Sequence, residues 1–314
     1  MPLKNEILTL METERGRFFS GAALAEKFGV SRNAVWKAVN ALKDEGHLIT
    51  AVGKKGYMLS EQSDRLSAEA VRAALGKGFD DVKILICDEV DSTNNAAKRL
   101  LAEENLSRAV IIADRQLNGR GHSGREFYSP AGTGLYLSAV LRPDKPFHEA
   151  VMYTAAAAVA AARAIERTAG VSTQIKWIND LYLGGRKVCG ILTEADTDFE
   201  TGRVRSMVIG IGINVTTVSF PDEMADKAAS LGINVPRCRL AAAVIAELYG
   251  IIDNQSDFMD EYRRRCFIIG REIGFSDGSR SFRGTVAGIG EGCELILDTD
   301  EGRFIFPHGE ITDF

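Results

Sequence analysis

Residues 114–130 read DRQLNGRGHSGREFYSP, and five of the seven residues 119–125 are glycine or arginine. Gly119, Gly121 and Gly124 match the GxGxxG pattern of dinucleotide-binding folds. In those folds the pattern ends a strand and begins a helix, so that a pyrophosphate meets the helix N-terminus. Here the residues that follow, FYSPAGTG, cannot continue as a helix. The stretch therefore argues against a doubly wound dinucleotide fold.

This glycine loop nevertheless suits an anionic ligand. Glycine lets a ligand approach the backbone closely, and the guanidinium groups of Arg120 and Arg125 match phosphate or carboxylate oxygens in bidentate geometry. For the loop considered alone, the alternative is a solvated turn without a ligand. The segments around the loop must distinguish an anion-binding loop from such a turn.

Strand-like and helix-like segments are mixed on both sides of the loop. Apolar runs typical of strands occupy residues 83–87, 109–113, 134–141, 173–177, 190–194 and 204–213. Segments of helical character occupy residues 92–103, 148–168 and 239–266. Because strands often follow one another directly, the pattern predicts an α+β domain with a mixed sheet. In residues 271–314, short strand-like pieces separated by glycine predict a small β-barrel.

The first 62 residues predict three helices and a hairpin. Ser20 suits the cap of a helix over residues 22–28, and Gly29 suits the left-handed turn after it. Ser31 then caps a helix over residues 32–44. Its expected buried stripe is Val35, Trp36, Val39 and Leu42. Residues 47–59 predict two short strands joined by Gly-Lys-Lys-Gly, and residues 60–64 a polar linker.

The spacing of Ala25, Gly29 and Val35 is that of a helix-turn-helix. A winged helix would place two groups of residues on DNA. These candidates are Ser31, Arg32, Asn33 and Lys37 at the start of the recognition helix, and Lys54 and Lys55 at the tip of the wing. The alternative is a helical protein-interaction module. Residues 1–62 hold nine basic and seven acidic side chains, so charge alone does not decide.

Two further motifs carry chemistry. In QIKWINDLYL, residues 174–183, Lys176 lies among apolar residues on a predicted strand, where an ammonium group is costly unless it reaches solvent or an anion. A snorkelling lysine at a sheet edge is the alternative. Asn179 and Asp180 are expected to form a turn. Residues 210–214, GIGIN, predict a tight strand end that admits an adenine or ribose, or simply packs closely.

Composition sets broad limits. With 314 residues, 45% hydrophobic and 26% charged, the chain is typical of a soluble protein with two or three domains. The net charge of −5 does not indicate nucleic acid globally. No signal-peptide core or membrane span is recognisable, so a cytoplasmic location is expected. The five scattered cysteines predict reduced thiols rather than a zinc site, and no metal site is predicted.

Taken together, the motifs resemble those of the biotin protein ligases. The family's five motifs appear here in order as Asp91-Ser92-Thr93-Asn94, Gln116 with residues 119–125, Lys176-Trp177-Ile178-Asn179-Asp180, residues 187–194, and residues 210–214. With the winged helix before them and the barrel after them, the resemblance covers essentially the whole chain and is closest to the bifunctional ligase–repressor subgroup.

The resemblance implies a fold and a domain division. The fold would be α+β, with an N-terminal winged helix-turn-helix, a central mixed-sheet ligase domain and a C-terminal small SH3-like β-barrel. The domains would be residues 1–62 for DNA binding, 66–268 for biotin and ATP binding, and 269–314 for the barrel.

It also implies a two-step reaction. Biotin and ATP form biotinyl-5′-adenylate and pyrophosphate, and a lysine of a biotin carboxyl carrier protein, as in acetyl-CoA carboxylase, then takes the biotinyl group. Mg²⁺ would arrive with the nucleotide. The adenylate would act as corepressor, promoting a homodimer that binds operator DNA.

Site residues follow from the same resemblance. Biotin would contact Ser92, Thr93, Asn94, Gln116, Arg120, Gly121, His122 and Lys176. Lys176 and Arg120 would be catalytic, because a fixed cation stabilises the charge that develops between two anionic reactants. Asn214 would lie on the nucleotide side.

Three positions depart from the family pattern. His122 stands in place of an arginine, Ile178 in place of a proline and Phe127 in place of a tryptophan. The first change removes a permanent charge, and the other two affect packing. Two rival functions stay open at this point: a lipoate–protein ligase-like enzyme, and a biotin-sensing repressor without catalytic activity.

Overall fold

A computed structural model describes residues 2–146, 149–198, 200–254 and 257–314. The chain divides into two compact units. One comprises Met1–Asp81 with Val235–Ala243, and the other comprises Val82–Asn234 with Val244–Phe314. Each is described by itself.

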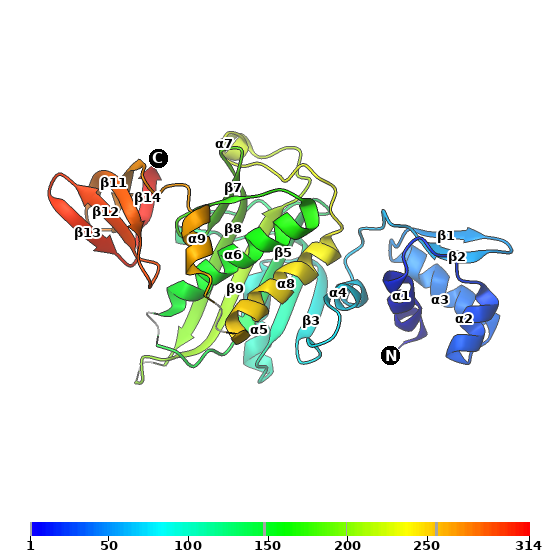
Figure 1. The fold of residues 1–314 in the computed structure, drawn as a ribbon. Coiled ribbons are helices and arrows are strands. Elements are labelled where there is room, and N and C mark those ends of the chain that lie inside the picture. The colour runs from blue at the N-terminus through cyan, green and yellow to red at the C-terminus, as the bar shows by residue number, and fades with distance from the viewer. Residues whose placement is uncertain (1, 147–148, 199, 255–256) are drawn as a thin grey trace. The chain divides into compact units, whose positions relative to one another are not determined.

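The first unit contains the predicted winged helix. Its helices and strands are α1 (Leu3–Thr13), α2 (Gly21–Phe28), α3 (Arg32–Asp44), β1 (Ile49–Val52), β2 (Gly56–Leu59) and α4 (Ala68–Leu75), labelled in Figure 1. Ser20 and Ser31 cap α2 and α3 by accepting hydrogen bonds from the backbone N–H groups of Ala23 and Ala34. Gly29 has φ of 64°, the left-handed conformation that the turn requires. These features confirm the predicted helix-turn-helix and hairpin. The helix α4 was not predicted.

The core of this unit corrects one expectation. Val35, Val39 and Leu42 of α3 are fully buried together with Ile7 and Met11 of α1. Trp36, expected in the same stripe, is 53% exposed. The reason is geometric, since Trp36 lies one residue after Val35 and therefore about 100° around the helix from the buried face.

The expected linker at residues 60–64 is also corrected, because these residues pack on the first unit. Ser63 is buried, and its hydroxyl accepts a hydrogen bond from the backbone N–H of Leu48 at 3.1 Å. Asp64 accepts a hydrogen bond from Nε of Arg237 at 2.6 Å. The polar composition of this run reflects hydrogen bonding within a folded unit.

The second unit is built on a seven-stranded mixed sheet of order β3-β4-β5-β9-β8-β7-β6. The strands are β3 (Lys83–Val90), β4 (Ala109–Gln116), β5 (Gly134–Leu141), β6 (Gln174–Lys176), β7 (Asp180–Leu183), β8 (Arg186–Thr197) and β9 (Val204–Asn214). β3 and β4 are parallel, and the other neighbours are antiparallel. The mixed sheet confirms the α+β prediction. Asp180 begins β7, so its expected place in a turn is corrected.

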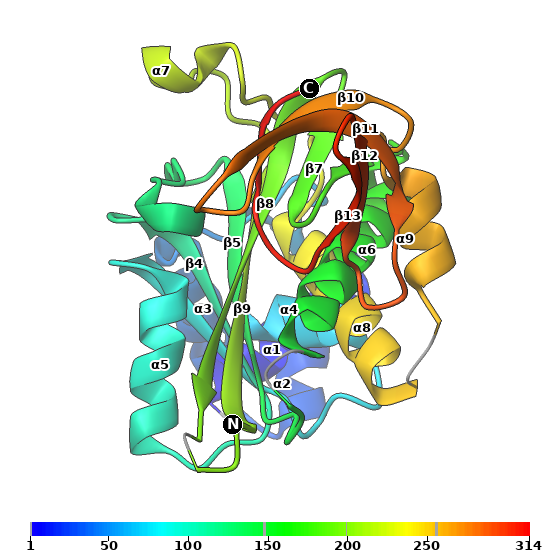
Figure 2. The ribbon, with the colours of Figure 1, turned by 90° about the vertical axis from the view of Figure 1, so that its left-hand side faces the viewer.

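Helices cover both faces of this sheet (Figure 2). α5 (Thr93–Glu103) lies on one face, and α6 (Ala150–Ala169) and α9 (Met259–Arg265) lie on the other. Helical segments were predicted at residues 148–168 and 239–266. The first corresponds to α6, with His148 outside the described residues. The second was expected as one helix, but the structure has α8 (Arg237–Asn254) and a separate α9.

The chain ends in a five-stranded antiparallel sheet of order β13-β12-β11-β10-β14. The strands are β10 (Glu272–Ser276), β11 (Ser281–Ile289), β12 (Leu295–Thr299), β13 (Gly302–Phe306) and β14 (Glu310–Asp313). Phe275 is buried at its centre, with its ring centroid 4.5 Å from that of Phe306. The indole N–H of Trp177 donates a hydrogen bond to the carbonyl of Cys293 at 2.8 Å and so joins this sheet to the larger one.

The described residues lack two features that would bear on function. No helix among them is long and apolar enough to cross a membrane. They contain no group of three or more histidine, cysteine, aspartate or glutamate side chains arranged to hold a metal ion. The five cysteines are free, and four of them are buried.

Candidate functional site

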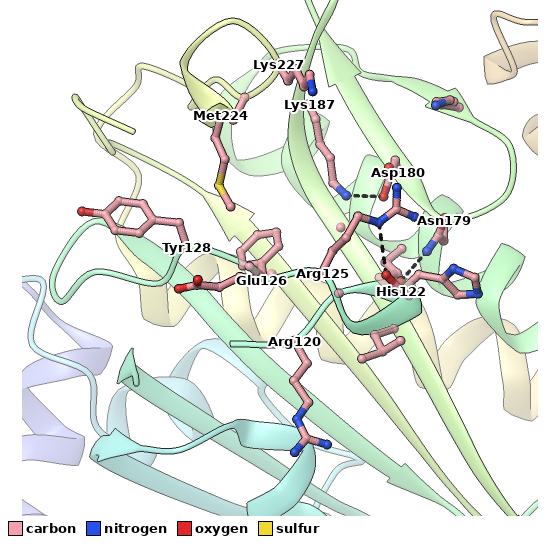
Figure 3. A pocket seen from close by; sticks show the side chains of 18 of the residues that line it. Arg120, His122, Arg125, Glu126, Tyr128, Asn179, Asp180, Lys187, Met224 and Lys227 are labelled. Atoms are coloured by element: carbon pink, nitrogen blue, oxygen red, sulfur yellow. Dashed lines mark hydrogen bonds and ion pairs between the residues drawn. The ribbon is translucent and has the colours of Figure 1, made fainter. Parts of the chain in front are cut away.

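A cavity of about 730 Å³ opens in the second unit where the glycine loop, the ends of β6 to β9 and the final strand meet. Its lining includes all eight predicted biotin-site residues and Asn214. Residues more than 80 positions apart in the sequence are therefore brought to one place. Figure 3 shows side chains of this lining, with Arg120, His122 and Arg125 projecting from the glycine loop.

The floor of the cavity is a connected polar network at the start of α5. Oε1 of Gln116 accepts hydrogen bonds from the backbone N–H and the hydroxyl of Thr93, at 2.8 and 3.1 Å. The hydroxyl of Ser138 lies 2.7 Å from Oγ1 of Thr93 and 2.6 Å from Oδ1 of Asn94. Because these groups fix one another, the floor is held in one arrangement before any ligand binds.

One floor residue has a hydroxyl that the network does not use. Ser92 is buried at the N-cap position of α5, but its side chain makes no capping hydrogen bond. Ser138 and Ser129 were missed in the sequence. Ser138 lies within an apolar strand, and Ser129, which accepts a hydrogen bond from Nε2 of Gln116 at 2.8 Å, lies in a polar run without a distinguishing motif.

The glycine loop folds back on itself as a short hairpin around a 3₁₀ turn at His122–Gly124. The backbone N–H of Gly121 donates to the carbonyl of Arg125 at 2.7 Å. Gly119 is buried so tightly that a Cβ there would lie 2.3 Å from the carbonyl oxygen of Phe127. The chain continues into the antiparallel strand β5 without an α-helix, which confirms the rejection of a dinucleotide fold.

The basic side chains of this loop differ in their surroundings. Arg125 forms an ion pair with Glu310 of β14 at 2.6 Å. Arg120 points away from Arg125 (Figure 3) and is exposed. His122 is exposed as well and lines the cavity with them.

Phe127 occupies the position where the family usually has tryptophan, and its ring lies over two glycines. A Cβ on Gly212 would lie 2.6 Å from the ring, and one on Gly190 would lie 3.2 Å from it. The glycines of the GIGIN motif thus make room for an aromatic wall. The motif also makes room for Asn94, because a Cβ on Gly210 would lie 2.3 Å from Oδ1 of that residue.

Lys176 lies on a strand, as predicted, and ends the edge strand β6, where it is half-buried in the cavity lining. Its Nζ lies 3.4 Å from the carbonyl of Ile311 and 4.6 Å from the ring centre of Phe314. Burial lowers the pKa of Lys176, and the nearby carboxylate of Asp180 partly opposes this shift. No carboxylate of the described residues forms an ion pair with this half-buried ammonium, so an anion in the cavity would bind it favourably.

A second lysine near Lys176 was not predicted. Nζ of Lys187 lies 2.6 Å from the carboxylate of Asp180, and both residues line the cavity (Figure 3). Lys187 belongs to a motif that was quoted in the sequence, but no role was assigned to it. Glu310 and Phe314 were missed as well, because nothing in the sequence indicates that the last strand returns to the ligase sheet.

Asn214 ends β9 and is buried. Its Nδ2 donates to the carbonyl of Ala229 at 3.1 Å, whereas its Oδ1 has no hydrogen-bond partner among the described residues. A buried acceptor left without a partner is costly, so a donor from a ligand would be favoured there. Within the cavity lining, the peptide bond between Trp177 and Ile178 is cis.

The DNA-contact candidates form a separate surface in the first unit. Ser31, Arg32, Asn33 and Lys37 are exposed in the first turns of α3, and Lys54 and Lys55 are exposed between β1 and β2. None of these four cations pairs with a carboxylate in the part of the chain that the structure describes. Such a surface is free to bind phosphate groups.

Comparison with known proteins agrees with both surfaces. Residues 86–214 match the model of the biotin/lipoate A/B protein ligase family, and residues 4–58 match that of an HTH domain. The bifunctional ligase/repressor BirA of Bacillus spizizenii is 34% identical, over 96% of this chain and 95% of the relative. BirA of Escherichia coli is 30% identical, over 91% and 89%.

Among solved structures, the biotin protein ligase from Aquifex aeolicus in complex with biotin and ATP superposes with a TM-score of 0.63. It is 27% identical, and the match covers 73% of this chain and 97% of that chain. The fold and the cavity thus define the class of protein ligases of the biotin and lipoate type, here preceded by a helix-turn-helix. Within that class, the chain belongs to the family of the bifunctional ligase/repressors BirA.

Proposed function

We propose that this chain is an ATP-dependent biotin protein ligase and a DNA-binding repressor of biotin genes. The observation that carries the ligase half is the position of Lys176, a half-buried cation that faces the same cavity as the fixed polar floor. A neutral, polar ligand head and an anionic reacting end can therefore be held at the same time.

In the first step, a carboxylate oxygen of biotin attacks the α-phosphorus of ATP. The bond from that phosphorus to the bridging oxygen breaks, and pyrophosphate leaves with the electron pair. Lys176 would neutralise oxygens of both reactants as charge builds up between them. Arg120, Gly121 and His122 would close over the adenylate from the loop side.

In the second step, the amine of a carrier-protein lysine attacks the carbonyl carbon of biotinyl-5′-adenylate. An amide bond forms, the mixed anhydride bond breaks, and AMP leaves after the amine has lost a proton. Ser92, Thr93, Asn94 and Gln116 would hold the ureido ring during both steps. Asn214 would present its unpaired oxygen to a donor on the nucleotide side.

Mg²⁺ would enter with the triphosphate. This fits the described residues, whose carboxylates do not gather into a metal cage, because Mg²⁺ in nucleotide sites is held largely by phosphates and water. When bound, the ion would neutralise phosphate charge.

The repressor half rests on the exposed cations of α3 and of the β1–β2 hairpin, which form no ion pair with a carboxylate among the described residues. We propose that they bind operator DNA, that biotinyl-5′-adenylate strengthens this binding, and that the binding form is a homodimer. The proposed division into residues 1–62, 66–268 and 269–314 assigns DNA binding to the first part.

Two assays separate the proposal from its rivals. Calorimetric titration with biotin and with lipoate identifies the acid that binds, and ATP–pyrophosphate exchange then shows whether that acid is activated. Exchange that depends on biotin supports the ligase. Preference for lipoate would indicate the lipoate–protein ligase-like alternative, and biotin binding without exchange would indicate a sensor without catalytic activity.

A further inference from the structure

Trp36 lies on the solvent-exposed face of α3. Its side chain is 53% exposed, whereas the neighbouring Val35 and Val39 are fully buried. At four residues after Arg32 and three after Asn33, it shares one face of the helix with both. The largest apolar side chain of α3 therefore lies exposed among polar residues. The helix is labelled in Figure 1.

Exposed cations on the same helix and on the hairpin of the same unit indicate what would cover the indole. Arg32 and Lys37 are exposed on α3, and Lys54 and Lys55 are exposed at the tip of the hairpin. The structure pairs none of these four with a carboxylate within its described ranges. An exposed apolar group in a unit that also exposes four cations without carboxylate partners among the described residues fits duplex DNA, in which phosphates border the apolar methyl groups of the major groove.

We propose that Trp36 reads sequence in the operator by packing its indole against the 5-methyl group of a thymine in the major groove. This inference rests on the proposed repressor function and names a residue that determines its specificity. Arginine and lysine contacts with phosphates fix the register but carry no base information. The thymine methyl group is recognised by apolar contact, which an exposed indole on a recognition helix supplies.

The test uses full-length protein saturated with biotinyl-5′-adenylate. Wild-type protein first enriches duplexes from a random-sequence library, and the enriched duplex is the probe. Trp36→Ala should bind this probe at least ~10-fold more weakly while retaining its affinity for mixed-sequence DNA. The slope of log affinity against log salt concentration should be the same for Trp36→Ala as for wild type. In Lys37→Ala this slope should be smaller in magnitude by about one.

The decisive step replaces each thymine of the probe in turn by deoxyuridine, which removes only the methyl group. At one or two positions wild type should lose affinity about 3- to 5-fold, the order expected for one buried methyl group. Trp36→Ala should show no loss there. Leu48→Ala, which removes an equally exposed apolar side chain from the same unit, is the matched control and should respond to deoxyuridine as wild type does.

Fluorescence gives an independent check, because the chain has only two tryptophans and Trp177 is buried. Adding the probe should protect the wild-type emission from acrylamide and should leave Trp36→Phe unaffected. Unchanged probe affinity in Trp36→Ala, or equal deoxyuridine losses in both proteins, would overturn the inference. A changed oligomeric state with intact base preference would instead assign Trp36 to self-association. If wild type enriches no sequence, the repressor function fails, and the inference with it.

Discussion

Nη1 of Arg125 lies 2.6 Å from Oε1 of Glu310, so an ion pair joins the glycine loop to the last strand of the chain. Nε of the same arginine donates to the carbonyl of His122 at 3.1 Å. One side chain therefore holds the 3₁₀ turn of the loop and links it to the C-terminal sheet. The loop that would cover the adenylate is anchored from outside the ligase sheet.

Glu310→Gln should weaken substrate binding only modestly. Both side chains of the pair are largely exposed, and exposed ion pairs contribute at most about 1 kcal/mol. The KM for biotin or ATP should rise about 2- to 5-fold, and high salt should erase the difference. Pyrophosphate exchange at low and high salt measures this. If Arg125→Gln raises the KM by its full factor in a protein that already carries Glu310→Gln, the two residues do not act as a pair.

Gly210→Ala should disturb the biotin floor. The new methyl group would lie 2.3 Å from Oδ1 of Asn94, so Asn94 must move and break its contacts with Ser138 and Glu194. We expect biotin affinity to fall at least ~10-fold, the order of one to two lost hydrogen bonds. Gly250→Ala is the matched control, because its added methyl group meets nothing within 4 Å. Equal calorimetric affinities for the two variants would argue against a fixed floor.

Arg32→Ala combined with Lys37→Ala should separate the two functions. Loss of two exposed cations of α3 should weaken operator binding and leave biotin ligation at the wild-type rate, because neither residue lines the cavity. Gel shift at physiological salt measures the DNA affinity, and biotinylation of the carrier protein measures the ligation rate. Lys77→Ala, an exposed cation outside the winged helix, controls for charge. Undiminished DNA affinity in the double variant would remove α3 from the interface.

His47 should make the first unit sensitive to acid. Burial lowers its pKa from 6.5 to about 4, and its Nδ1 has no partner among the described residues. Between pH 6.5 and 4 the unfolded chain therefore binds a proton that the folded chain does not, so the contribution of neutral His47 to stability is lost as pH falls. The thermal unfolding temperature should drop less on acidification in His47→Gln than in wild type. Parallel curves for the two proteins would contradict this assignment.

The sequence predicted local features well where a single physical requirement acts. Ser31 caps α3, Gly29 makes the turn and Lys176 lies on a strand, as expected from capping, φ and burial rules. These features depend on residues within one or two turns of each other. The motif residues of the biotin site could be grouped in advance, because their order along the chain resembles that of a known family. The structure brings them together in one cavity.

Features that depend on distant contacts were not predictable. Trp36 was placed in the core because it is large and apolar, but helix geometry turns it outward, and only the packing of α1 fixes which face is buried. Residues 60–64 looked like a linker because their partners, such as Leu48 and Arg237, are remote in sequence. Glu310 and Phe314 reach the cavity only through the pairing of β14 with β10.

Lys176 should activate a carboxylate and a phosphate in one cavity, and biotin-dependent ATP–pyrophosphate exchange measures this step. Lys176→Ala should lower the exchange rate at least ~100-fold, the order found when a main stabiliser of transition-state charge is removed. Lys83→Ala, a half-exposed lysine outside the cavity, should leave the rate unchanged. Exchange at near wild-type rate in Lys176→Ala would contradict the account.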